Sequence, residues 1–311
     1  MPENVNYQDG SKWTSLIWAA WFGHERISNS LIEKEADLDL ETDSGDTALI
    51  KSAFRLESTY SLWIFSCYLS HSLTPRGFDR IATALIDAGA NIDHQDSGGR
   101  TALIDAAKYQ HPWIGKLSFV LLFWTCPHCF DRSTPFSSRS IDQPTVVLSL
   151  DWIIQTIRPY SVHSLLEKGC KINTRDNTRQ NALMYVAMNG NAKIAISLFD
   201  KGIELNAQNF DGDTALIMAT VRNYSNITRP IIESGRAYVN IQNENGESAL
   251  IWCAARNYVD IAASLIDRCA DVNLKNRDGI TALDIAIREN HQAVVEAINK
   301  GPSEKSLCWQ S

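Results

Sequence analysis

The chain has 311 residues, of which 44% are hydrophobic and 21% charged, a composition typical of a folded protein that excludes disorder of the whole chain. Its formal net charge of −7 gives no electrostatic reason to bind nucleic-acid phosphates or an anionic membrane surface. Neither nucleic acid nor a membrane is therefore expected as a partner.

The N-terminus and the cysteines both indicate the cellular compartment. The first ten residues, MPENVNYQDG, contain neither the basic region nor the apolar run of a secretory signal. The 7 cysteines are irregularly spaced, which favours reduced thiols over a disulfide framework. The longest apolar runs fall far short of the roughly 20 residues that a membrane helix needs. We therefore expect an intracellular, cytoplasmic protein without structural disulfides.

A four-residue signal recurs along the chain, as T-A-L-I or a close relative. Its copies begin at Thr14, Thr47, Thr101, Asn181, Thr214, Ser248 and Thr281, which we call the anchors. The anchors are 33, 54, 80, 33, 34 and 33 residues apart, and removing insertions of 21, 47 and 1 residues leaves a constant period of 33. Such a period indicates a solenoid of stacked repeats. The sequence predicts an array of seven copies over residues 6–302 and a C-terminal tail over residues 303–311.

Each copy contains the same elements in the same order. The Thr, Asn or Ser anchor is predicted to cap a short helix, which carries small residues such as Ala106 and Ala107 where it presses against its neighbours. A second amphipathic helix follows, as in Ile261 and Leu265. A glycine then ends that helix in most copies, and a hairpin leads to the next anchor. The fold predicted from this pattern is an all-α solenoid of helix-turn-helix-hairpin units.

Two of the copies are interrupted at the turn between their helices. The insertions cover residues 56–76 in copy two and 112–158 in copy three, and the repeat resumes in phase after each. Closing a loop of about 50 residues costs only about 2 kcal/mol more than closing a short one. Their apolar stretches, 62–65 and 117–124, are unusual for solvent-facing loops. Two interpretations stay open: gene segments read through into the protein, or functional extensions that lie on the array.

The segment Cys126-Pro127-His128-Cys129 in the second insertion is the sharpest chemical motif. A C-x-x-C pair can lower a thiol pKa or supply half of a metal site. An insertion of 47 residues cannot hold a thioredoxin-like domain, and a zinc site would need further ligands nearby. Nucleotide-binding and hydrolase motifs are absent from the sequence. We therefore expect no enzyme activity, no catalytic residue, no cofactor and no metal site.

The pattern resembles the ankyrin repeat family, whose units read D-x-x-G-x-T-P-L-H-x-A-A-x-x-G-H and end in G-A-D-V-N. The stretch Asn276 to Leu283 matches the beginning of that pattern, and Ala270-Asp271-Val272-Asn273 matches its end. Two departures concern the turn glycine, which is Lys12 in copy one and Arg179 in copy four, so that these two hairpins are in doubt. The resemblance implies a non-catalytic scaffold that binds a protein partner through its concave face and hairpin tips.

The same resemblance implies where the partner would bind: at the residue before each anchor and at the end of each first helix. From these positions we select Trp13, Trp21, Phe22, Asp46, Phe54, Arg55, Arg100, Lys108, Tyr109, Met188, Arg222, Arg256 and Arg288. In copy one, the aromatic residues could equally shield the exposed end of the stack. The partner is a protein of unknown identity and the chain itself is expected to be a monomer. The alternatives are thiol redox or metal binding at Cys126 and Cys129, or a regulatory subunit of a larger assembly.

Overall fold

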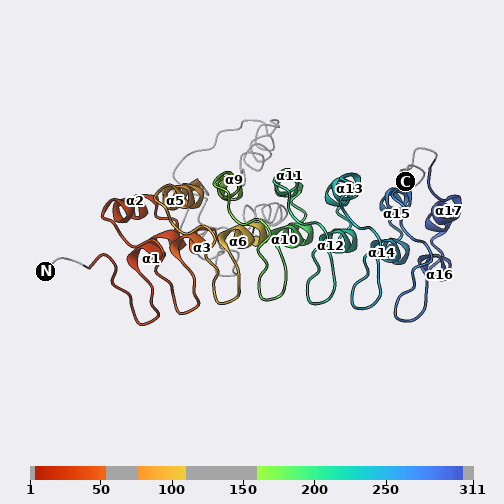
Figure 1. Cartoon of the computed structure of the whole chain (residues 1–311), viewed down its shortest axis with the longest axis horizontal. Helices are drawn as coiled ribbons and strands as arrows, with labels where there is room; N and C mark the ends of the chain where they lie inside the picture. Colours follow the sequence, from red (N-terminus) through yellow and green to blue (C-terminus); the bar gives the residue numbers. More distant parts are fainter. Residues whose placement is uncertain (1–3, 54–75, 110–159, 304–311) are drawn as a thin grey trace, which may run out of the picture.

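The computed structural model describes residues 4–53, 76–109 and 160–303 of the chain. Helices in this part occur in pairs, and the paired helices form two parallel rows with the hairpins projecting from the first row (Figure 1). The first helices of the pairs are α1 (Ser15–Phe22), α3 (Ala48–Ala53), α6 (Ala102–Tyr109), α10 (Ala182–Asn189), α12 (Ala215–Val221), α14 (Ala249–Arg256) and α16 (Ala282–Arg288). The second helices are α2 (Glu25–Glu33), α5 (Arg76–Asp87), α9 (Tyr160–Glu167), α11 (Ala192–Asp200), α13 (Ser225–Glu233), α15 (Val259–Asp267) and α17 (Gln292–Lys300). The predicted all-α solenoid is confirmed.

All seven anchors cap their helices as predicted. In each copy the anchor side chain accepts a hydrogen bond from the backbone N–H three residues later, over distances between 3.0 Å at Asn181 and 3.4 Å at Thr47. Thr281 forms a full capping box, because the Asp284 side chain also accepts from the Thr281 backbone. Each cap satisfies a donor that the helix itself leaves unpaired, worth about 1 kcal/mol. The anchor column therefore fixes where the first helices begin.

The apolar columns of the repeat form one continuous core. Every second helix after α2 contributes fully buried aliphatic side chains, such as Leu85, Leu198 and Leu265, which are 0% exposed. The small residues of the first helices, such as Ala106 and Ala107, are also 0% exposed, as their size predicts. First helices pack against the first helices of neighbouring copies, and second helices against second helices. Each copy is thus stabilised mainly by its neighbours.

A ladder of Asp and Asn side chains joins successive copies at the loop that follows each second helix. In each step the side-chain oxygen of one copy accepts a hydrogen bond of 2.6–2.8 Å from a backbone N–H of the next copy. The acceptors are Asn6, Asp39, Asp93, Asn173, Asn206 and Asn240. In each copy the acceptor follows an aliphatic residue, as in Leu38-Asp39 and Leu205-Asn206, and the ladder explains why Asp or Asn recurs at this position.

The hairpins of copies one and four form despite the missing glycine. Lys12 and Arg179 adopt φ values of 61° and 60°, in the left-handed region that Gly212 and its equivalents occupy. A Cβ atom on Gly212 would lie 2.7 Å from the backbone nitrogen of Glu244 in the next hairpin. The real Cβ atoms of Lys12 and Arg179 are accommodated by a small displacement of the next hairpin.

That displacement is visible in the hydrogen bonds between successive hairpins. After Lys12 and Arg179 the bond measures 3.3 Å, from Asp43 N to Ser11 O and from Phe210 N to Thr178 O. After the glycine hairpins it measures 2.8–3.0 Å, as from Glu244 N to Asp211 O. Copies one and four therefore keep the fold but bind the following hairpin less closely.

Candidate functional site

The inner face of the array is the surface formed by the first helices and the bases of the hairpins. Four aromatic side chains gather on it in copy one, and we call Trp13, Trp18, Trp21 and Phe22 the aromatic cluster. Trp13 lies 4.3 Å from Trp18 and 5.9 Å, edge-on, from Trp21, measured between ring centroids. Trp18 stacks on Phe22 at 5.7 Å, and these two side chains are 42% and 37% exposed.

The aromatic cluster has structural features of both roles considered for copy one. Trp13 is partly buried and packs against the core, as a residue that shields the end of the stack would. Trp18 and Phe22 instead offer an exposed, stacked aromatic surface, which is the composition of an interface anchor. Trp18 was not among the residues selected from the sequence. Its position, three and four residues before Trp21 and Phe22 on the same helix, is the signal that could have identified it.

A lysine of copy two joins the aromatic cluster to the next copy. The Lys51 ammonium lies 5.3 Å from the ring centroid of Trp13 and 5.1 Å from that of Trp21, within the range of cation–π attraction. It also lies 2.7 Å from Asp46 Oδ2. The Lys51 side chain is only 13% exposed. Lys51 was missed from the sequence, whereas Asp46, which was selected, turns out to hold this lysine in place.

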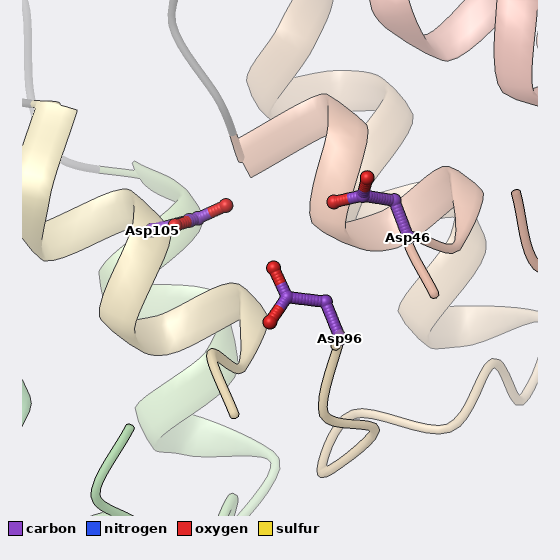
Figure 2. Close-up of side chains that lie close together, drawn as sticks. All are labelled: Asp46, Asp96 and Asp105. Atoms are coloured by element: carbon purple, nitrogen blue, oxygen red, sulfur yellow. The ribbon is translucent and has the colours of Figure 1, made fainter. Parts of the chain in front are cut away.

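Three carboxylates meet between copies two and three, and we call Asp46, Asp96 and Asp105 the carboxylate cluster. One carboxylate oxygen from each lies within 4.8 Å of the others, and the three groups point toward one another (Figure 2). All three side chains are nearly inaccessible, with exposed fractions of 4%, 1% and 1%. The sequence analysis predicted no metal site because it found no local metal-binding motif. It could not identify this cluster, because the three carboxylates come from separate segments of two copies.

Arg100 neutralises part of this charge. Its Nε and Nη2 atoms donate to Asp96 Oδ2 at 2.9 and 2.6 Å. Asp96 Oδ1 accepts from the backbone N–H groups of Gly98 and Arg100, both at 2.8 Å. Asp105 Oδ1 lies 3.3 Å from Arg100 Nη1, but neither Asp105 oxygen has a partner in hydrogen-bond geometry. Burial raises the pKa of Asp105 to about 7, against the attraction of Arg100 and with the repulsion of Asp96 and Asp46.

Oxygen ligands of this kind suit a hard cation such as Mg²⁺ or Ca²⁺. Within the cluster, however, the guanidinium of Arg100 and the ammonium of Lys51 already contact the carboxylates. A divalent ion would have to compete with both. The arrangement is therefore better suited to a single additional positive charge.

Copy four continues the inner face with a second polar contact. The Lys108 ammonium lies 5.3 Å from the ring centroid of Tyr185, and the Tyr185 hydroxyl donates to Asp176 Oδ2 at 2.6 Å. Burial, together with this hydrogen bond to Asp176, raises the pKa of Tyr185. Lys108, selected from the sequence, thus contacts the neighbouring copy.

The remaining selected residues follow one another copy by copy toward the C-terminus. Met188 packs partly buried against the core, and Arg222 is exposed. The guanidinium carbon of Arg256 lies 6.0 Å from the ring centroid of Trp252, and Arg288 pairs with Glu289 at 3.2 Å on the surface. Phe54, Arg55 and the motif at residues 126–129 lie outside the described residues. Tyr109 ends α6, and its side chain also lies outside the description.

The described cysteines differ from the expectation that the chain has no disulfide. Cys269 is disulfide-bonded, so the expectation of reduced thiols throughout is wrong. The irregular spacing on which that expectation rested does not show which cysteines the fold brings together. Cys170 and Cys253 are buried free thiols. Burial raises the pKa of Cys170 to about 11 and also raises that of Cys253, so neither forms a reactive thiolate at neutral pH.

These features define a class of protein: a helical-repeat solenoid whose inner face carries a run of aromatic and charged side chains. The family model for ankyrin repeats, in three copies, matches residues 154–241 and 231–305. The chain belongs to the ankyrin repeat family. Within the ranges that the structure describes, every helix is too short or too polar to span a bilayer.

Two solved structures have the same fold. The ankyrin repeat domain of human ASB11 matches with a TM-score of 0.61 and 17% identity, over 94% of this chain and 100% of that chain. The ankyrin repeat domain of Bcl-3, described as a unique member of the IkappaB protein family, matches with a TM-score of 0.62 and 18% identity, over the same shares of 94% and 100%. No curated protein sequence matches the chain.

Proposed function

We propose that this chain is a non-catalytic, monomeric scaffold that binds a protein partner through the inner face and the hairpin tips. Ankyrin repeat domains are generally protein–protein interaction modules. The observation that supports this role here is the exposed aromatic pair of Trp18 and Phe22, which stands outside the apolar core columns at one end of the inner face. Neighbouring aromatic rings that stay exposed are a common mark of protein interfaces, which use such rings as anchors.

The proposed contact surface extends from the aromatic cluster along the first helices to Arg288. Arg222 and Arg288 occupy it as exposed cationic side chains, and Arg256 continues the same column. The proposed interface then has an aromatic core, which would contribute most of the affinity, and a row of charged side chains, which would orient the partner. These surface residues, and not the residues that form the repeat fold, would determine which partner binds.

The test compares arginines on the two faces of the array, once a partner has been captured on the full chain. One variant carries Arg222→Ala, Arg256→Ala and Arg288→Ala on the first helices. The matched control carries Arg26→Ala, Arg80→Ala and Arg229→Ala, which are exposed on the second helices and remove the same charge. We expect the first variant to lose at least about tenfold in affinity, since interface arginines commonly contribute 1–2 kcal/mol or more.

The control should bind within about twofold of the parent chain, as peripheral substitutions usually do. Both variants should unfold like the parent, because these side chains lie outside the core. Equal losses in the two variants, or a loss in the control alone, would place the partner elsewhere than on the inner face.

A further inference from the structure

The carboxylate cluster lies where two copies of the repeat meet. Asp46 belongs to the hairpin before α3, Asp96 to the hairpin before α6, and Asp105 to α6 itself. The carboxylate oxygens are within 4.8 Å of one another although the residues come from different copies (Figure 2). Any change in the charge of this cluster therefore acts on the contact between copies two and three.

Among the described residues, two cations contact the three carboxylates of the cluster. Lys51 lies against Asp46 at 2.7 Å, and Arg100 is bound twice to Asp96. The cation in contact with Asp105 is the same guanidinium, whose Nη1 atom lies 3.3 Å from Asp105 Oδ1 without hydrogen-bond geometry. A carboxylate that is 1% exposed and accepts no hydrogen bond is costly to keep ionised. One further unit of positive charge would balance the group.

Among the described residues, the elements packed against α6 bring no further cation into contact with the cluster. These elements are α3, α9 and α10. Lys51 of α3 is engaged by Asp46, and Tyr185 of α10 donates its hydroxyl to Asp176. On α9, His163 pairs with Glu167 at 3.0 Å, with both side chains at least 60% exposed. Lys108, at the end of α6 itself, lies over the ring of Tyr185 and has the weakest effect on the pKa of Asp105 among the charged groups around it, lowering it.

We propose that the carboxylate cluster is a proton-binding site, in which Asp105 takes up one proton and thereby couples the packing of copies two and three to pH. A proton is the smallest positive charge, and it fits a closed cluster that already holds a guanidinium and an ammonium. Burial raises the pKa of Asp105 to about 7, so the exchange falls in the physiological range. Loss of the proton leaves a buried charge that competes with Asp96 for Arg100.

The consequence for binding rests on the function proposed above. Asp46 and Arg100 are predicted contact residues, and both belong to the network that the proton reorganises. The inner face would then carry one more negative charge above neutral pH than below it. The affinity for a charged partner would change over the same interval as the ionisation of Asp105.

The proton site itself is tested on the full chain without any partner. Carbon-13 NMR of aspartate carboxyl groups should show one resonance that titrates between pH 6 and 8 in the parent chain and is missing in Asp105→Asn. In parallel, the unfolding equilibrium constant of the parent should rise with pH between 5 and 7, by up to about tenfold per pH unit, since one proton is released on unfolding. In Asp105→Asn that rise should disappear.

Asp278→Asn is the matched control, because Asp278 is exposed in the hairpin of copy seven. It should keep both the resonance and the pH dependence. A spectrum in which every aspartate titrates below pH 5 overturns the proposal, whether or not Asp105→Asn folds. Stabilisation of the parent chain by millimolar Mg²⁺ or Ca²⁺ at pH 8, absent in Asp105→Asn, also overturns it in favour of a metal site. A titrating resonance together with a partner that ignores the inner face would retain the proton site and reject the proposed function.

Discussion

Gly212→Ala should be much more destabilising than Gly202→Ala, although the two glycines have nearly the same backbone conformation. Their φ values are 75° and 81°, so an alanine at either position carries the cost of the left-handed region, about 1–2 kcal/mol. Part of that cost is offset by the lower entropy of the unfolded alanine chain, about 0.4–1 kcal/mol. Gly202→Ala, whose Cβ would meet nothing within 4 Å, should therefore lose about 1 kcal/mol.

At Gly212 the added Cβ meets backbone as well. It would lie 2.7 Å from Glu244 N and 3.0 Å from the backbone carbon atoms of Asn243, which cannot move as a flexible side chain can. The bond from Glu244 N to Asp211 O, now 2.8 Å, should lengthen toward the 3.3 Å that follows Lys12 and Arg179. Weakening this hydrogen bond adds up to about 1 kcal/mol. We expect a total near 2 kcal/mol for Gly212→Ala.

Urea unfolding followed by circular dichroism measures both losses, and hydrogen exchange of the Glu244 amide locates the second one. The Glu244 amide should exchange faster in Gly212→Ala and unchanged in Gly202→Ala. Equal losses of stability in the two variants, with equal protection of Glu244, would refute the argument that the hairpins control each other's spacing through the missing Cβ.

Two further predictions concern the ladder and the core. Asn206→Ala removes the acceptor for Tyr238 N at 2.8 Å and the donor to Arg236 O at 3.0 Å, and should reduce the free energy of unfolding by about 1–3 kcal/mol. In the same urea titration, Asn226→Ala on the exposed surface should change the free energy of unfolding by less than about 0.5 kcal/mol. Leu265→Ala truncates a side chain that is 0% exposed and should reduce the free energy of unfolding by about 2–5 kcal/mol and lower the melting temperature. Ile196→Ala, at a side chain that is 49% exposed, should leave the melting temperature nearly unchanged. Similar melting temperatures for these two variants would contradict the assignment of the core column.

The parts of the fold that the sequence predicts are those that depend on local chemistry repeated in every copy. The anchor Thr214 caps a helix because its hydroxyl is in reach of a backbone N–H three residues away, a contact that spacing alone determines. The same holds for the glycine that ends each second helix. Glu35 departs from that column and still adopts a φ of 57°, because the packing of neighbouring copies outweighs the local preference.

The contacts of the candidate site could not be predicted in this way, because they join residues of different copies. Trp13 was identified, but its partner Lys51 is 38 residues further along the chain, and the ring-to-ammonium distance of 5.3 Å depends on how closely the copies stack. Asp46 was selected as a contact residue, and its side chain is only 4% exposed beneath Lys51. A position in the repeat predicts which face a residue belongs to, but not which neighbour covers it.

Some contacts between copies can be predicted by comparing equivalent positions of successive repeats. The position four residues after each anchor is held in the first four copies by Trp18, Lys51, Asp105 and Tyr185, and in the last three by Met218, Trp252 and Ile285. In a solenoid, equivalent residues of adjacent copies are spatial neighbours. At this position Trp18 is exposed, whereas Lys51 and Asp105 are 13% and 1% exposed, so each of these two charges needs a partner within the protein. Lys51 contacts both the aromatic cluster and a carboxylate, while the cation in contact with Asp105 is a guanidinium that it shares with Asp96, and this difference makes Asp105 the group that responds to protons.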